Sequence, residues 1–491
     1  MNIQISDLEL ISTANLGSKE FYRVSDNYRY CGWIDHPHCL IEKSSGRHLI
    51  LRGKDAEAIQ LCNGKIDCSL ELIPTSFKDG IKHLTKLDYI EACEAGRENK
   101  DPYVLYQNRE INFLTWAVTG GCNLKCRHCF LSAPNAKYGE LTTDACMRII
   151  DDMANCGVTN IAITGGEPLF RNDIRTLIKY ITNKGIVLSG IATNGTLVTD
   201  SFLDFLEEID CHPQIKMSYD GVNGWHDWLR GIPGSERLLI SAYQRLYERG
   251  FHTGTSMTVH KGNSELIFDT IQKMTECHSE LFKANVVLNV GEWGSFAAGM
   301  EMNYKELFES YLKTIGQLYA AYPDGMPLTV LLNRFITINK GSVDYRLIPV
   351  LKPCTTFCDL RACESTYRRF HISGDGRIQP CLLMSSVDEQ HLRLPFVQEK
   401  GLVACMNDPA FLEMSEITVG QVYDHNSGCK DCKYSAYCAG GCRAMGCIEK
   451  QSDYLSKDIS ACLFFKGGYI DRVVSLINSV CPKAKCINFD I

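Results

Sequence analysis

Three cysteines at a short, regular spacing point to metal chemistry in the first half of the chain. Cys122, Cys126 and Cys129 stand with three and then two residues between them. They follow the apolar run at 111–118, which is typical of a buried strand. Three thiolates can hold three corners of an iron–sulfur cubane and leave one iron open, because a complete ligand set needs a fourth. A zinc site with His128 as the fourth ligand is the alternative at this point.

A second motif makes the first more specific. Gly165-Gly166-Glu167-Pro168 follows the next predicted strand, and the two motifs together resemble the radical S-adenosylmethionine (SAM) superfamily. The resemblance implies that the three cysteines hold a [4Fe-4S] cluster, whose fourth iron is chelated by the amino and carboxylate groups of SAM. It also implies that the Gly-Gly-Glu-Pro segment grips the amino group. Two glycines allow close backbone approach, and Glu167 is an anion suited to an ammonium.

Strand and helix patterns alternate between residues 111 and 322. Strands are predicted at 112–118, 159–164, 187–192, 214–218, 254–259 and 285–290, and helices at 143–155, 173–184, 200–209, 237–249 and 264–275. This alternation requires right-handed crossovers and a parallel sheet. We therefore predict an α/β fold with a partial (β/α)6 TIM-like barrel, whose site is built by the loops at the carboxyl ends of the strands.

Other polar residues fall on the same predicted face. By resemblance, Ser218 and Asp220 reach the SAM ribose, and Arg230 pairs with the SAM carboxylate. An ordinary surface ion pair is the alternative for Arg230. Asn194, after the third strand, is a further candidate for cofactor binding. His128 occupies a position where the family usually has an aromatic residue near the adenine.

The C-terminal part is unusually rich in cysteine. Thirteen of the 25 cysteines lie from Cys354 onward, and metal ligation explains them better than disulfides in a reducing cytoplasm. Their spacing resembles the SPASM pattern of auxiliary [4Fe-4S] clusters, whereas a zinc ribbon would leave most of these thiols unexplained. By resemblance, one cluster uses Cys358, Cys363, Cys381 and Cys442, and the other uses Cys429, Cys432, Cys438 and Cys462. Cys354 competes with Cys358, and if both are free, an open iron is available to a substrate thiolate.

The first 100 residues predict a small winged-helix-like α+β domain. Strand signals at 39–42 and 48–52 flank a polar turn, and helical patterns follow at 54–62 and 77–89. Acidic residues slightly outnumber basic ones here, which argues against a DNA reader. The segment resembles PqqD-like domains, which capture a leader peptide as an added strand. A structural domain without this role is the alternative.

Composition limits the remaining possibilities. The net charge of −7 gives no basic surface for nucleic acid. No run of eighteen apolar residues and no export signal is present, so we expect a cytoplasmic protein without a membrane partner. The predicted domains are a peptide-recognition domain at 1–100, a radical SAM barrel at 111–325 and an auxiliary-cluster domain at 353–491.

The resemblance implies an enzyme that modifies a ribosomally made peptide through a 5′-deoxyadenosyl radical. It would use three [4Fe-4S] clusters, SAM, a precursor peptide with a leader, and an external donor of the flavodoxin or ferredoxin type. A thioether from cysteine sulfur to carbon is the favoured product. The alternatives are carbon–carbon cross-linking, epimerisation, and sulfatase-maturase-like oxidation, although Leu382 stands where those maturases have aspartate. A non-enzymatic alternative is an Fe–S electron carrier or leader-binding scaffold.

Overall fold

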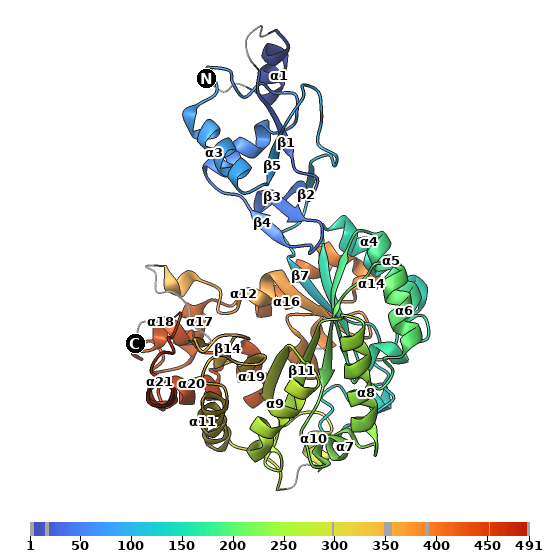
Figure 1. Ribbon diagram of the computed structural model, residues 1–491, viewed down its shortest axis with the longest axis vertical. Coiled ribbons are helices and arrows are strands. Elements are labelled where there is room, and N and C mark those ends of the chain that lie inside the picture. The colour runs from blue at the N-terminus through green and yellow to red at the C-terminus, as the bar shows by residue number, and fades with distance from the viewer. Residues whose placement is uncertain are drawn as a thin grey trace. The chain divides into compact units, whose positions relative to one another are not determined.

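The computed structural model describes residues 4–14, 19–296, 299–347, 356–387, 392–450 and 452–488. The chain divides into two compact units (Figure 1). The first comprises residues 1–113 with 151–160 and 184–187, and the second comprises the remaining residues. Among the described helices, none combines the length and the apolar character that a bilayer crossing requires.

The first unit contains the helices and the hairpin predicted near the N-terminus. Its elements are α1 (Ile5–Ala14), β1 (Phe21–Val24), β2 (Tyr28–Trp33), β3 (His36–Glu42), β4 (His48–Ile50), α2 (Lys54–Ala58), α3 (Thr75–Lys86), β5 (Ile90–Cys93) and β6 (Val104–Tyr106). In the described part of this unit, one sheet has the order β4-β3-β2-β6, and β1 pairs with β5. Because β6 pairs with β2, the unit extends beyond residue 100.

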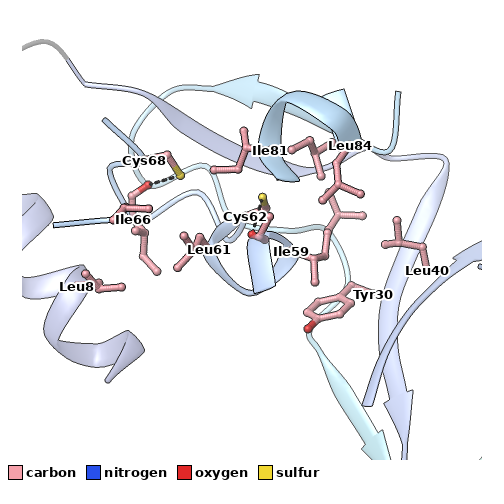
Figure 2. Close-up of a cluster of buried hydrophobic side chains, with 14 of the residues drawn as sticks. Leu8, Tyr30, Leu40, Ile59, Leu61, Cys62, Ile66, Cys68, Ile81 and Leu84 are labelled. Carbon is pink, nitrogen blue, oxygen red and sulfur yellow. Dashed lines mark hydrogen bonds between the residues drawn. The ribbon is translucent and has the colours of Figure 1, made fainter. Parts of the chain in front are cut away.

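A cluster of apolar side chains from α1, the strands and α3 forms the core of this unit (Figure 2). Two of its buried members are cysteines. The Cys62 thiol donates to the carbonyl of Ala58 at 3.3 Å, and the Cys68 thiol donates to the carbonyl of Ile66 at 3.6 Å. These thiols pack as small hydrophobic groups rather than as candidate metal ligands.

The second unit is built on the predicted alternation of strands and helices. Its barrel elements are β7 (Phe113–Ala117), α4 (Thr143–Asn155), β8 (Asn160–Thr164), α5 (Ile174–Asn183), β9 (Val187–Thr193), α6 (Asp200–Glu208), β10 (Gln214–Ser218), α7 (Trp225–Arg230), α8 (Ser235–Glu248), β11 (Thr253–Val259), α9 (Ile267–Glu276), β12 (Leu281–Val286), α10 (Trp293–Phe296), α11 (Tyr304–Ala321) and β13 (Thr329–Leu332). Strands β9 to β13 pair in parallel, as do β7 and β8. The predicted α/β class and partial barrel are confirmed.

The two faces of this sheet differ in polarity. Buried residues such as Ile163 and Met217 alternate with half-buried residues such as Thr164 and Ser218. The apolar set packs beneath amphipathic helices, for example α5, which buries Leu177 on its inner side. Figure 1 shows α4, α5 and α6 together along one side of the strands. The opposite face of the sheet is therefore the polar inner wall of the barrel.

The structure corrects the sixth strand and extends the sheet. The strand predicted at 285–290 is β12, at Leu281–Val286. Its apolar pattern is hidden because Lys283 and Asn285 occupy the polar inner face. Among the described residues the sheet has 11 strands, in the order β15-β14-β13-β12-β11-β10-β9-β8-β7-β16-β17. The additional strands are β14 (Ile336–Ile338), β15 (Tyr345–Leu347), β16 (Arg369–Ile372) and β17 (Ile378–Gln379).

The cysteine-rich segment is mainly short helices. They are α12 (Glu364–Arg368), α14 (Val397–Lys400), α15 (Leu402–Met406), α16 (Pro409–Ser415), α17 (Val419–His425), α18 (Ser435–Cys438), α19 (Arg443–Glu449), α20 (Ile459–Phe465) and α21 (Tyr469–Val480). This segment also completes the barrel sheet, because β16 lies next to β7. His371 of β16 lies 3.1 Å from the hydroxyl of Thr115 on β7.

Candidate cluster and cofactor site

The cysteine loop after β7 is held by loops that follow other strands of the barrel. Its carbonyl at Gly121 accepts from the amide of Glu167 at 2.9 Å. Its amide at Arg127 donates to the carbonyl of Leu229 at 2.9 Å, and its carbonyl at Cys129 accepts from the amide of Glu292 at 3.0 Å. The loops after β8, β10 and β12 thus fix the backbone that presents the thiols. The predicted gathering of motifs at the carboxyl ends of the strands is confirmed.

Each of the three thiols accepts a hydrogen bond from a nearby N–H group. The amide of Leu124 donates to Cys122 Sγ at 3.4 Å, and the amide of Ala133 donates to Cys129 Sγ at 3.3 Å. The third donor is the Arg230 guanidinium, which donates to Cys126 Sγ. Burial, opposed by the hydrogen bond from Leu124 and assisted by the neighbouring cysteines, raises the pKa of the Cys122 thiol to about 12. Hydrogen bonds to sulfur are a usual means of stabilising and tuning an iron–sulfur cluster, so these residues fit a [4Fe-4S] group.

The zinc alternative receives no support from the geometry. Within the described ranges, no three His, Cys, Asp or Glu side chains converge closely enough to hold one metal ion. A tetrahedral zinc site requires such convergence. In a cubane each thiolate binds a different iron, so its sulfur ligands stand further apart. His128, the expected fourth zinc ligand, lies instead among Arg230, Asp220 and other histidines.

The glycines after β8 permit close contact with the cysteine loop. A Cβ atom at Gly166 would lie 2.1 Å from the carbonyl oxygen of Gly121, and a Cβ atom at Gly165 would lie 2.4 Å from that of Thr119. Gly165 also has a positive φ of 150°. Both positions therefore require glycine, as the motif predicts.

Glu167 is fully buried and is held by the chain itself. Its carboxylate accepts from the amide of Asn194 at 2.6 Å, the hydroxyl of Thr193 at 2.7 Å and the amide of Leu169 at 3.0 Å. Burial raises the pKa of this carboxyl, and the three hydrogen bonds oppose that effect. Both carboxylate oxygens thus join the loops after β8 and β9, and the expected pairing with an ammonium stays a prediction.

Replacing Gly166 by alanine should separate the two loops. The added methyl group overlaps backbone atoms of Gly121, and overpacking of this kind costs about 1–3 kcal/mol. We expect a lower thermal unfolding temperature and weaker SAM binding by calorimetry. Gly316→Ala is the matched control, because this residue lies in α11 of the same unit, its φ is not positive and a Cβ atom there meets no neighbouring atom within 4 Å. Equal SAM affinity in the Gly166→Ala protein would contradict the close-approach argument.

Arg230 forms a buried ion pair at the centre of the site. Its Nε donates to Asp220 Oδ2 at 2.6 Å, and its Nη1 donates to Cys126 Sγ at 3.6 Å. Arg230 is 8% exposed and Asp220 is fully buried, so the alternative of a surface ion pair is wrong. Burial disfavours the charge on Asp220, but the Arg230 guanidinium holds the pKa of this carboxyl below its ordinary value.

Asp220 is already engaged on both oxygens. Besides Arg230, it accepts from the amide of Thr258 on β11 at 2.9 Å. This arrangement makes Asp220 the partner that orients Arg230, and its expected contact to a ribose stays a prediction. Ser218, the other expected ribose contact, lies half-buried on the inner face, in register with Ser256.

Three imidazoles beside this ion pair each have a buried nitrogen atom without a hydrogen-bond partner in the described part of the chain. Among the described residues, His128 Nδ1, His226 Nε2 and His260 Nε2 have no hydrogen-bond partner. Burial, reinforced by Arg230, lowers the pKa of His128 to about 3, so its imidazole is neutral. Neutral imidazoles at the mouth of the barrel fit the polar nucleoside part of SAM, which offers donors and acceptors.

A polar network that the sequence did not predict supports these residues. The side chain of Asn194 donates to Asn123 Oδ1 at 2.8 Å, and Asn123 donates to the hydroxyl of Thr196 at 2.9 Å. Asn194 Oδ1 accepts from the amide of Thr196 at 2.9 Å. Asn194 is thus tied to the cysteine loop, and its role in cofactor binding stays a prediction. The one signal in the sequence is that Asn123 lies inside the cysteine motif.

The cysteines expected to hold the second auxiliary cluster surround one cavity. Cys429, Cys432, Cys438 and Cys462 all line it, from the turn after α17, from α18 and from α20. Lys457, Lys466 and Tyr423 also line the cavity. Four thiols around one cavity fit a complete [4Fe-4S] ligand set, and the lysines fit its negative charge.

Cys442 lies close enough to two other cysteines expected for the first auxiliary cluster to raise the pKa of their thiols. Burial and then Cys442 raise the pKa of Cys363, and the same two causes raise that of Cys381 to about 12. Cys358 differs, since it is exposed and lies against Gly420 of α17. Cys354, its competitor for this position, lies outside the described residues.

Arg443 lies close enough to cysteines of both groups to interact with them electrostatically. It is buried, and its Nη1 and Nη2 atoms donate to the carbonyls of Ser456 at 3.0 Å and Gly441 at 3.1 Å. Burial lowers its pKa, whereas Cys442, Asp458 and then Cys363 and Cys438 raise it. Arg443 therefore places a cation beside both expected clusters and fixes the loop that carries Cys442.

Together these features define a class of protein: a partial TIM-like barrel that presents a three-cysteine loop at the carboxyl ends of its strands. Comparison with known families agrees with this class. Residues 116–274 match the model of the radical SAM superfamily, so the chain contains a radical SAM domain.

Relatives extend the similarity beyond this domain. The chain is 26% identical to an AdoMet-dependent heme synthase of Methanosarcina barkeri (strain Fusaro / DSM 804), over 70% of this chain and 94% of that protein. It is 23% identical to AlbA, the antilisterial bacteriocin subtilosin biosynthesis protein of Bacillus subtilis (strain 168), over 74% and 73%.

Among solved structures, SuiB of Streptococcus suis bound to S-adenosylmethionine shares the fold. The TM-score is 0.60 with 18% identity, and the match covers 89% of this chain and 99% of SuiB. SuiB has also been solved bound to its precursor peptide SuiA, with a TM-score of 0.58 and 17% identity over 90% of this chain and 100% of SuiB.

Proposed function

We propose that this chain is a radical SAM enzyme that oxidises a ribosomally made precursor peptide and forms thioether bonds from cysteine sulfur to carbon. The observation that carries the proposal is the pairing of two chemistries in one compact unit. A three-cysteine loop stands at the barrel mouth, and further cysteines gather in the C-terminal segment.

The chain's residues would hold the reacting groups and shield them from water. Cys122, Cys126 and Cys129 would hold the SAM-binding cluster, and Arg230, oriented by Asp220, would pair with the SAM carboxylate. When the cluster and SAM are bound, they supply hydrogen-atom abstraction from an unactivated carbon.

The C-terminal cysteines support the choice of a thioether. Thioether formation replaces one C–H and one S–H bond by a C–S bond, which is a net two-electron oxidation. Cys442 raises the thiol pKa of both Cys363 and Cys381, whereas Cys358 is exposed at Gly420. A cluster held by three thiols would keep an iron open to a substrate thiolate. We also propose that a donor of the flavodoxin or ferredoxin type supplies electrons from outside.

The peptide substrate is supported by two similarities. SuiB, whose match covers 89% of this chain, has been solved with a precursor peptide, and AlbA is named for bacteriocin biosynthesis. We further propose that the first unit binds a leader peptide along an outer strand of its sheet. The outer strands are β4 and β6, and β6 exposes Val104 and Leu105. An edge strand with unpaired backbone groups can accept an added strand.

The experiment uses the full chain with its clusters reconstituted under anaerobic conditions. SAM, a reductant and a cysteine-containing peptide encoded beside its gene are added, with and without the leader part of that peptide. We expect 5′-deoxyadenosine and a peptide lighter by two hydrogens for each cross-link, with one cysteine per cross-link resistant to alkylation. The leaderless peptide should react far more slowly.

Other outcomes of this experiment contradict parts of the proposal. The same mass loss with every cysteine still alkylated would indicate a carbon–carbon bond. A peptide mass that is unchanged in ordinary water, but that rises by one deuterium in heavy water, would indicate epimerisation. No 5′-deoxyadenosine under strong reduction would indicate an electron carrier or a binding scaffold. Equal rates with and without the leader would remove the role proposed for the first unit.

A tetrapyrrole substrate is the second candidate function. The similarity to an AdoMet-dependent heme synthase, which spans 94% of that relative, favours it. Incubation with an iron porphyrin that carries propionates separates the two functions. Loss of a carboxyl group from the porphyrin, with every tested peptide unchanged, would overturn the peptide proposal.

A further inference from the structure

Two lysines lie close together on the polar inner wall of the barrel. Lys216 is on β10 and Lys283 is on β12, with β11 between them. Residue pairing aligns Lys216 with Gly254, and it aligns Ser256 with Lys283. Because side chains alternate along a strand, both lysines lie opposite the buried residues Ile215 and Phe282, which are on the helix side.

The strand between them leaves room for the two side chains. Gly254 has no side chain, and a Cβ atom there would meet Lys216 Cγ at 3.6 Å. The next inner-face position on β11 is Ser256, which accepts a hydrogen bond from Asn285 Nδ2 at 3.2 Å. The surroundings of the lysines on this strand are therefore small and uncharged.

Neither lysine has a partner in the part of the chain that the structure describes. No hydrogen bond or ion pair joins Lys216 or Lys283 to any described residue, whereas Arg334 nearby pairs with Asp458 at 2.8 Å. Lys216 is exposed and Lys283 is half-buried; partial desolvation lowers the pKa of both lysines, and Lys216 and Arg334 lower that of Lys283 further. Two like charges held in a concave wall without a counter-ion favour the binding of an anion.

We propose that Lys216 and Lys283 bind a carboxylate of the substrate inside the barrel. The inference rests on the proposed function and adds a substrate feature: an acidic side chain close to the position that reacts. A carboxylate suits the site because ammonium groups bind it as point charges. The charge of Cys442 raises the pKa of Lys283. The carboxylate would therefore lie on the side of the barrel that faces the first auxiliary cysteines.

Chemical footprinting of the full, cluster-loaded chain tests the binding directly. Reductive methylation of each lysine is followed by mass spectrometry in the presence of a capped glutamate-rich hexapeptide, its glutamine counterpart, an iron porphyrin with propionates, or SAM alone. We expect the glutamate peptide to slow the methylation of Lys216 and Lys283 and the glutamine peptide to leave it unchanged. Lys179, exposed on α5, should be unaffected throughout and serves as the internal control.

The remaining arms decide the source of the carboxylate. Protection by the porphyrin but not by the glutamate peptide would keep the carboxylate site and assign it to a tetrapyrrole, against the peptide function. Protection by SAM alone would overturn the proposal, because the lysines would then serve the cofactor. No protection by any carboxylate would also overturn it, even if the enzyme modifies its peptide, so the two failures are distinguishable.

Variants supply the second readout. In Lys216→Met/Lys283→Met we expect KM for an acidic precursor peptide to rise about 10- to 100-fold, with SAM affinity unchanged, because hydrogen bonds to a charged group are lost. Replacing the peptide's acidic residues by amides should raise KM for the wild type by the same factor, with no further loss in the variant. Lys179→Met is the matched control. A variant that loses iron but keeps its KM would show that the lysines balance cluster charge instead.

Discussion

Replacing Cys126 by alanine should abolish the cleavage of SAM. Cys126 is one of three thiols on the loop and the one that accepts a hydrogen bond from Arg230. With two thiols left, the loop cannot retain a cubane, so no cluster is present to donate the electron that cleaves SAM. We expect no 5′-deoxyadenosine above background and a loss of about one third of the bound iron, since one of three expected clusters is removed.

The control for this variant is another half-buried cysteine of the same unit. Cys277 follows α9 and belongs to none of the expected ligand sets. Cys277→Ala should keep the iron content and the rate of SAM cleavage of the parent. If Cys126→Ala retained its iron and still produced 5′-deoxyadenosine, the three-cysteine assignment would be wrong.

Replacing Arg230 by methionine should strongly destabilise the second unit. The change removes the partner of Asp220, which is fully buried and whose pKa lies below its ordinary value. Leaving a buried carboxylate unpaired typically costs about 3–5 kcal/mol. We expect a clear fall in the unfolding temperature and in SAM affinity, measured by calorimetry.

A double variant separates charge from packing in this result. Arg230→Met/Asp220→Asn removes both charges, so it should recover much of the lost stability while SAM affinity stays low. Arg249→Met breaks surface ion pairs with Asp204 and Glu207 and should shift the unfolding temperature less than Arg230→Met does. Equal destabilisation by Arg249→Met and Arg230→Met would contradict a special role for the buried pair.

Local spacing was enough to predict the chemistry of the cysteine loop and the need for glycine after β8. Cys122 to Cys129 and Gly165 to Glu167 are each a few residues apart, so their own backbone limits how far they can separate. Amphipathic periodicity was likewise enough for α4, which the sequence predicts at 143–155 and the structure places at Thr143–Asn155.

Pairing between distant segments could not be predicted in the same way. Arg230 is 104 residues from Cys126 along the chain, and His371 is 256 residues from Thr115, yet the fold brings each pair into contact. The same applies to the strand β16 beside β7, which no local pattern indicates. These contacts depend on how the sheet curves and which edge it leaves open.

By itself, then, the sequence determined the candidate ligands and the α/β barrel, because short-range spacing and periodicity record them. Only the tertiary structure decided that Glu167 and Asp220 are held by the chain's own donors. It also decided that Lys216 and Lys283 share the inner wall without a partner among the described residues. Burial and pairing belong to the assembled sheet, since a side chain's surroundings come mostly from strands and loops remote in the chain.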